Sequence, residues 1–217
     1  MASSDNILCR YPVPRASVDA PWRTEILIKK SRFVTRSFRC AEAEELKNFI
    51  ASLRQKEADA SHHCWAFVAG GPGDSAQIGC SDDGEPHGTA GKPMLNILLH
   101  SGVGQIGAVT SRWFGGIKLG TGGLVRAYQS CVRENLLDLP IIELMPKEKW
   151  TVLTDYQSLE AIKRALPELE TELLEEKFQD KVELVLNAPI ENGELLAKKL
   201  SGLSRGTAIL RRIATLV

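Results

Sequence analysis

Residues 112–128 read RWFGGIKLGTGGLVRAY, and they join two segments of different periodicity. The preceding stretch IGAVTSRWF (106–114) is typical of a strand, whereas LVRAYQSCVRENLLDL (124–139) has apolar residues at helical spacing. Five glycines lie between Gly115 and Gly123. Because each glycine weakens a helix or strand by roughly 0.5–1 kcal/mol, the run indicates either unusual backbone angles or close approach of another group.

A second segment has the same local design. In GTAGKP (88–93) a glycine-containing turn leads into a predicted helix, KPMLNILL. The first N–H groups of a helix lack partners and the helix dipole makes that end positive, so an anion can bind there. The two helix starts predict a surface that binds anions or nucleic acid, formed by Gly88, Thr89, Gly91, Lys92, Arg112, Gly115, Gly116, Lys118, Gly120, Thr121, Gly122 and Gly123. Alternatively, the glycines serve only tight turns and close packing, or contact another protein.

The N-terminal part outside these segments alternates between strands and one helix. RTEILIKKSRFVTRSFRC (23–40) predicts two strands with a break at Lys29-Lys30-Ser31. Strands are also predicted at 62–70 and, shorter, at 76–80. A helix is predicted within 41–60 from the i, i+3, i+4, i+7 spacing of Leu46, Phe49, Ile50 and Leu53.

The pattern changes near PIIELMPK (140–147), where a domain boundary is predicted. The order β-α-β-β-α-β that follows is the signature of a ferredoxin-like domain. Residues 169–178 are ambiguous, because their glutamates and leucine spacing would also suit a helix. We therefore expect an α+β protein with a loose leader at 1–21, an N-terminal domain at 22–143 and a C-terminal domain at 144–217.

Composition excludes several classes of protein. The 27 basic and 27 acidic residues balance, so only a local patch could bind a polyanion. Five scattered cysteines without a CxxC pair argue against a disulfide framework or a zinc site, and they fit a cytoplasmic protein with reduced thiols. No apolar run approaches the roughly 18 residues of a membrane span, and the first residues lack the apolar core of a signal peptide. GxxxxGK[ST] and GxGxxG are absent, so we expect no nucleotide cofactor.

The loop SDDGEPH (81–87) offers another kind of site. Asp82, Asp83 and Glu85 supply the oxygen ligands that Mg²⁺ and Mn²⁺ prefer, so a metal-dependent phosphoester hydrolase is an alternative function. However, Asp-Gly and Glu-Pro are ordinary turn pairs, and acidic side chains cap helices. The expectation is that the protein holds no metal and no other cofactor.

No catalytic residue is assigned from the sequence. The nucleophile motif GxSxG is absent. His62 and His63 would point to opposite faces of a strand, so at most one of them joins a given site. Cys64 beside them is expected to be a small apolar side chain of a strand rather than a nucleophile.

A basic cluster and two aromatic residues are further candidates for nucleic-acid contact. Trp113 or Phe114 would stack on a base if exposed, although bulky aromatic residues of strands more often belong to the core. The cluster comprises Lys29, Lys30, Arg32, Arg36 and Arg39. Its alternative role is that of a solvated strand edge, where lysine prevents aggregation.

Four strings together resemble the YigZ/IMPACT family: KKSRF (29–33), HHCWAF (62–67), SDDGEPHGTAGKPML (81–95) and RWFGGIKLGTGGLVRAY (112–128). The last two are long, gap-free and specific, and the likeness extends over nearly the whole chain. It implies an N-terminal domain similar to the second domain of a small-subunit ribosomal protein. It also implies a C-terminal domain similar to a domain of elongation factor G. Trp113 departs from the Tyr or Phe that is common at its position.

The resemblance implies a role in translation but no reaction. Eukaryotic members regulate translation through an additional domain that has no counterpart in these residues, so their mechanism is not carried over. The expected function is therefore a non-enzymatic module that binds RNA or ribosomal components, with a protein partner in translation possible. The alternatives are the hydrolase described above and a purely protein-binding adaptor.

Overall fold

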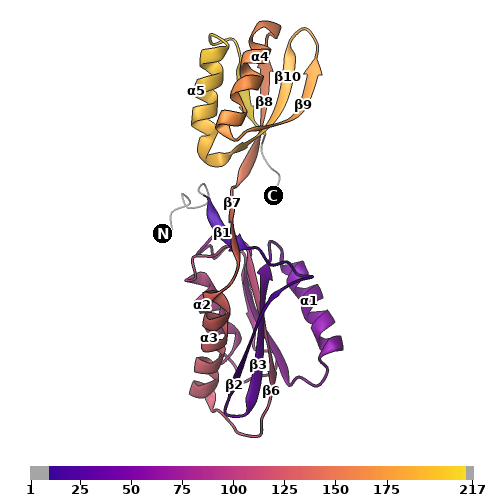
Figure 1. The fold of residues 1–217 in the computed structure, drawn as a ribbon, viewed down its shortest axis with the longest axis vertical. Helices are drawn as coiled ribbons and strands as arrows, with labels where there is room; N and C mark the ends of the chain where they lie inside the picture. The colour runs from indigo at the N-terminus through magenta and orange to yellow at the C-terminus, as the bar shows by residue number, and fades with distance from the viewer. Residues whose placement is uncertain (1–9, 214–217) are drawn as a thin grey trace. The chain divides into compact units, whose positions relative to one another are not determined.

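The computed structural model describes residues 10–213, which form two compact units (Figure 1). One unit is Tyr11–Leu144, and the other runs from Met145 onward and includes Arg10. The division falls at Leu144, one residue from the boundary expected from the sequence. The chain is an α+β protein, with helices and antiparallel sheets in both units.

The N-terminal unit is built on a five-stranded sheet in the order β2-β3-β6-β4-β5, and all of its neighbouring strands are antiparallel. The strands are β2 (Trp22–Ile28), β3 (Ser31–Arg39), β4 (His62–Val68), β5 (Ile78–Ser81) and β6 (Ile106–Trp113). β3 and β4 both pair with β6, so the connection through α1 (Ala43–Lys56) is a split β-α-β unit. The strands and the helix predicted in this region are confirmed, with β5 shifted by about two residues.

Helices cover both faces of this sheet (Figure 1). α1 packs Leu46, Ile50 and Leu53 against one face, where they meet Phe38 and Val109. α2 (Gly91–Leu99) and α3 (Thr121–Leu137) cover the other face. That face carries the larger core, which includes Phe33, Cys64, Ala66, Met94, Ile106, Ala108 and Tyr128. The central strand β6 is therefore buried on both sides, and all of its residues except Trp113 are buried.

A two-residue turn joins β2 to β3, because Ile28 pairs directly with Ser31. Lys29 and Lys30 both have positive φ, at 44° and 67°. Positive φ at both central positions defines a type I′ turn, which matches the twist of the two strands and usually contains Asn-Gly. The predicted break at this point is confirmed, although neither residue is one that favours the turn.

Residues 11–21 are not the loose leader that was expected. β1 (Tyr11–Pro14) pairs antiparallel with β7 (Ile141–Leu144), with Tyr11 opposite Leu144. The backbone N–H of Arg39 also donates to the carbonyl of Ala16 at 2.8 Å. This part of the chain is tied into the N-terminal unit by partners far away in the sequence. Residues 1–9 of the predicted leader lie outside the described residues.

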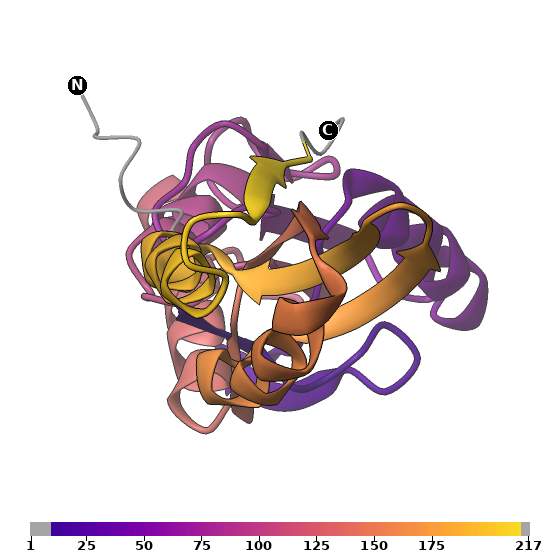
Figure 2. The same ribbon diagram turned by 90° about the horizontal axis from the view of Figure 1, so that it is seen from above.

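The C-terminal unit has the predicted β-α-β-β-α-β order. Its elements are β8 (Lys147–Thr154), α4 (Tyr156–Ala165), β9 (Glu172–Phe178), β10 (Val182–Pro189), α5 (Gly193–Leu203) and β11 (Ile209–Arg212), with short 3-10 turns η2 (Pro167–Leu169) and η3 (Ile190–Asn192). The sheet order is β11-β8-β10-β9, with every pair antiparallel. Figure 2 shows α4 and α5 on the same side of this sheet, and apolar residues of both helices share one core with β8 and β10. The ambiguous segment 169–178 is mainly a strand.

None of the helices among residues 10–213 has the length and apolar character that a membrane crossing requires.

Candidate functional site

The loop after β5 closes onto the start of α2 through one carboxylate. Asp82 accepts hydrogen bonds from the backbone N–H groups of Gly88 (2.8 Å), Ala90 (3.0 Å) and Gly91 (2.8 Å). Burial opposes ionisation of this carboxylate, but the three bonds outweigh burial and lower the pKa of Asp82. The donors predicted to bind an external anion at this helix start already bind a carboxylate of the chain itself. This geometry argues against the α2 half of the predicted anion site.

The other predicted residues of this segment have separate roles. The Thr89 hydroxyl donates to the carbonyl of Pro86 at 2.6 Å, within a buried turn. Gly91 lies so close to Ser81 that an added Cβ would meet its backbone at 2.7 Å, so the glycine is required by packing. Lys92 is exposed in the first turn of α2.

Arg112 lies inside the protein rather than on a phosphate-binding surface. It is 5% exposed, and its Nη1 donates to Glu85 Oε1 at 2.6 Å. The same carboxylate oxygen accepts a hydrogen bond from the Tyr128 hydroxyl at 2.8 Å. Burial raises the pKa of Tyr128, so this residue is a neutral donor. The prediction that Arg112 neutralises a phosphate is therefore corrected, because Glu85 already balances its charge in a buried position.

The three carboxylates of SDDGEPH point to three different partners. Asp82 binds the start of α2, and Glu85 binds Arg112 and Tyr128. Asp83 accepts from the backbone N–H of His63 at 2.6 Å and pairs with Arg54. In the described part of the chain, no three His, Cys, Asp or Glu residues are arranged to hold a metal ion. The loop acts as a hub of structural hydrogen bonds, and this arrangement gives no support to the hydrolase alternative.

The residues around β4 are also structural. Cys64 is fully buried, and burial raises the pKa of its thiol, as expected for a strand cysteine without nucleophilic character. His62 and His63 lie on opposite faces, as predicted. His63 Nδ1 lies 2.9 Å from Ser111 Oγ, which donates to Glu57 Oε2 at 2.9 Å. Glu57 also pairs with Arg36 beneath α1, and no pattern in the sequence indicates this network.

The predicted basic cluster on β3 therefore divides into buried and exposed members. Arg36 is 8% exposed and belongs to the Glu57 network. Arg32 stacks over the ring of Trp113 at 3.8 Å, and Arg39 donates to Gln105 at 2.9 Å. Lys29, Lys30 and Arg39 are exposed and form no ion pair among residues 10–213, and the two lysines lie at the tip of the β2–β3 turn.

The glycine loop after β6 packs against this same turn. An added Cβ at Gly115 would meet the Lys30 carbonyl at 2.0 Å, so only glycine fits there. The backbone N–H of Gly115 also donates to Ser31 Oγ at 3.2 Å. Figure 1 shows the β2–β3 turn and the β6–α3 loop at the same end of the unit. The glycine run indicated close approach of another group. At Gly115 that group is the chain's own backbone at Lys30.

Helix α3 begins three residues earlier than predicted, so Gly122 and Gly123 belong to its first turn. Its N-cap residue Gly120 has a φ of 72°, and no side chain of residues 10–213 caps the helix start. Thr121 and Gly122 are exposed, whereas Gly91, the first residue of α2, is buried. The position of a Cβ on Gly122 lies 3.7 Å from Arg126 Nη1, which puts a guanidinium beside the exposed helix start.

We call this end of the N-terminal unit the basic pole. It comprises the exposed cations Lys29, Lys30, Lys118 and Arg126 around loop 115–120 and the first turn of α3. None of these four cations forms an ion pair with another described residue. Of the residues predicted to bind anions, the structure brings Gly115, Gly116, Lys118, Gly120, Thr121, Gly122 and Gly123 together here, and it excludes Arg112 and the capped start of α2.

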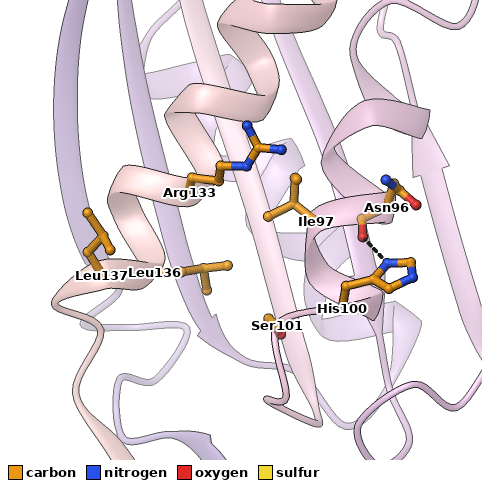
Figure 3. Close-up of a pocket in the computed structure, with 7 residues that line it drawn as sticks. All are labelled: Asn96, Ile97, His100, Ser101, Arg133, Leu136 and Leu137. Carbon is orange, nitrogen blue, oxygen red and sulfur yellow. Dashed lines mark hydrogen bonds between the residues drawn. The ribbon is translucent and has the colours of Figure 1, made fainter.

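A pocket lies at the opposite end of α3, away from all of the predicted site residues. It has a volume of about 490 Å³ and lies between the C-terminal turns of α2 and α3 (Figure 3). Leu136, Leu137 and Arg133 line it from α3, facing Ile97 and His100. His100 Nδ1 lies 2.7 Å from the Asn96 carbonyl, which ties the ring to the end of α2.

Fold and site together define a two-domain α+β protein whose N-terminal domain presents a basic pole. The Impact N-terminal domain matches residues 29–136. The chain is 44% identical to the IMPACT family member YigZ of Escherichia coli over 86% of this chain and 91% of that protein. It is 40% identical to an IMPACT family member of Haemophilus influenzae, covering 94% of this chain and 97% of the relative. The chain belongs to the IMPACT family.

A solved structure supports the same fold. A crystal structure of a hypothetical protein with 41% sequence identity superimposes with a TM-score of 0.70, covering 94% of this chain and 98% of the other.

Proposed function

We propose that this protein binds RNA, including the RNA of the ribosome, through the basic pole of its N-terminal domain. The observation that carries the proposal is the group of four unpaired cations, Lys29, Lys30, Lys118 and Arg126, around the uncapped start of α3. Backbone N–H groups at an exposed helix start bind phosphate oxygens, and neighbouring lysines add charge without demanding a base sequence.

The local positive charge at the pole matters because the net charge of the whole chain is zero. With 27 basic and 27 acidic residues, the protein offers no long-range attraction to a polyanion. At the pole, by contrast, Asp83 and Glu85 are neutralised by Arg54 and Arg112. The lysines of the pole form no ion pair with a described carboxylate, so their charges are available to bind a phosphate.

The backbone of the β2–β3 turn supports the same interpretation. Lys29 and Lys30 both adopt positive φ, at 44° and 67°, where a residue with a side chain is disfavoured by roughly 1–2 kcal/mol. Asn-Gly would form this turn with less strain. Strained backbone that persists at an exposed turn is typical of residues kept for function. Here it places two adjacent exposed lysines at the tip of the turn.

The proposal extends to the cellular role that family membership suggests. RNA binding at the pole would make the protein a non-enzymatic, cytoplasmic component that regulates translation. The likeness of its domains to a ribosomal-protein domain and to a ferredoxin-like domain of elongation factor G is consistent with such a role. A purely protein-binding adaptor remains the competing function, and it predicts no affinity for RNA at low salt.

The experiment compares two triple variants of the full chain by fluorescence anisotropy with a labelled oligoribonucleotide. Lys29→Ser, Lys30→Ser and Lys118→Ser together remove three cations of the pole. The matched control removes three exposed lysines elsewhere that form no ion pair among residues 10–213, Lys56, Lys181 and Lys198.

We expect the pole variant to lose affinity and the control variant to keep it. Because each phosphate contact contributes roughly 0.7–0.9 to the slope of log K against log salt, loss of three contacts should lower that slope by about 2. Binding should persist in EDTA, since no metal takes part. Equal losses in both variants, or no binding by the parent protein at about 50 mM salt, would refute the proposal.

A further inference from the structure

An exposed aromatic side chain lies within the basic pole. Phe114 follows β6 directly, and the residue is 49% exposed although seven of the eight residues of β6 are buried. Its backbone N–H donates to Ser61 Oγ at 3.2 Å, which fixes the start of the loop. The next residue, Gly115, is locked against Lys30 by the close approach described above. Phe114 is therefore held on a fixed backbone with its ring partly in solvent.

The surroundings of the ring are cationic and apolar. The guanidinium carbon of Arg112 lies 5.5 Å from the ring centroid, a cation–π distance. Ile117, three residues further along the loop, is 41% exposed. Burying a phenylalanine side chain normally stabilises the fold by about 1.5–3 kcal/mol. The buried Phe33 and Phe38 provide this stabilisation, whereas the half-exposed Phe114 provides only part of it.

We infer that the basic pole takes single-stranded RNA, with an unpaired base stacked on Phe114 and the adjacent phosphates on Lys30 and Lys118. The inference rests on the proposed function and names its ligand class. An aromatic ring between unpaired lysines is the arrangement by which proteins bind single strands, because every base offers a π face. In an A-form duplex the bases are stacked on each other and their faces are inaccessible, so a duplex can use the lysines but not the ring.

The test uses three labelled probes with the full chain: oligouridylate of about 12 nucleotides, an abasic ribose-phosphate strand of the same length, and an RNA duplex of that length. The abasic strand retains the phosphates and removes the stacking partner. We expect oligouridylate to bind about 5- to 100-fold more tightly than the abasic strand, which is the range for one stacked base.

Variants separate the ring from the charges. Phe114→Ala should reduce oligouridylate affinity to that of the abasic strand, and Phe114→Trp should preserve it. Phe178→Ala removes an exposed phenylalanine (56%) of the other unit and should change nothing. Because Phe114 is half exposed, its removal should leave the thermal unfolding midpoint in place, and this is checked on the same samples.

The outcomes distinguish this inference from the proposed function. If the abasic strand or the duplex binds as tightly as oligouridylate, or if Phe114→Ala keeps full affinity, single-strand stacking is refuted while phosphate binding stands. If none of the probes binds at low salt, the proposed function fails, and this inference fails with it.

Discussion

The Asp82 carboxylate accepts a hydrogen bond from the backbone N–H of Gly91, at 2.8 Å, where helix α2 begins. A glycine-containing turn before a helix is the pattern from which we predicted an external anion. At α2 the chain supplies that anion itself, from a residue nine positions earlier in the sequence. At the equivalent start of α3, where the N-cap residue is Gly120, no described residue supplies such a side chain. The same local sequence pattern thus has a structural outcome at one helix and leaves an open site at the other.

Replacing Asp82 should destabilise the N-terminal unit. Asp82→Ala removes the acceptor of three backbone N–H groups, and we expect a loss of about 2 kcal/mol in the free energy of unfolding, the upper range for a helix cap. Asp82→Asn keeps one acceptor oxygen but loses the charge, and should cost about 1 kcal/mol. Urea denaturation measures both, with the exposed Asp59→Asn as the control that should change nothing. An unchanged midpoint for Asp82→Ala would contradict the capping role.

Because Glu85 and Arg112 form a buried ion pair, two substitutions around Glu85, Glu85→Gln and Tyr128→Phe, should lower the free energy of unfolding by different amounts. Glu85→Gln leaves the buried guanidinium of Arg112 without a counter-charge, and we expect a loss of about 3 kcal/mol. Tyr128→Phe removes a neutral donor to Glu85 and the acceptor of a weak Cys64 thiol hydrogen bond, and should cost about 1 kcal/mol. Hydrogen exchange of the β6 amides reports on both. Similar losses for the two variants would show that the charge of Glu85 is not what stabilises this site.

Local patterns in the sequence were sufficient where each element buries one face on its own. Leu46, Ile50 and Leu53 predicted α1 because their spacing brings them to one side of a helix. Alternation predicted β2 for the same reason, since its residues alternate between partly buried and exposed. The pairing of Tyr11 with Leu144 had no local signal, because it joins segments from opposite ends of the unit. A strand whose partner lies that far away cannot be recognised from its own four residues.

The burial of Arg112 could have been predicted by extending the alternation of inward-facing residues along the whole of β6. Ile106 and Ala108 face the core beneath α2 and α3. Arg112 is an even number of residues further along β6, so its side chain lies on the same face of the strand. Continuing the alternation would have pointed the guanidinium inward, toward Glu85. Phe114 would lie on this face too if β6 continued. The strand ends at Trp113, however, and Phe114 is exposed rather than part of the core. The sequence could not indicate this strand end, because it depends on how Gly115 meets Lys30.

Stability should fall in mild acid because of His63. Burial lowers the pKa of this residue below 6.5, so the folded protein holds it neutral while the unfolded chain takes up a proton. In the window between 6.5 and the lower folded pKa, the unfolded state therefore binds more protons, and stability decreases as pH falls. His63→Asn, which retains a donor toward Ser111 but cannot titrate, should abolish this slope. Urea midpoints from about pH 8 to pH 5 test it; an unaltered slope would assign the acid sensitivity to other groups.

The turn between β2 and β3 predicts that one double substitution raises stability and lowers RNA affinity together. Lys29→Asn with Lys30→Gly relieves two left-handed backbone conformations, and we expect a gain of about 1 kcal/mol in the free energy of unfolding. The same change removes two cations of the basic pole and should weaken binding to oligouridylate.

Lys29→Gln with Lys30→Gln separates these two effects, because it removes the charges but keeps side chains on the strained backbone. Its RNA affinity should fall to the level of the Asn-Gly variant, while its stability stays close to that of the parent protein. If the Asn-Gly turn brought no gain in stability, the two lysines would not be under strain. If it gained stability without losing affinity, the lysines would not contact RNA, and their strained turn would need another explanation.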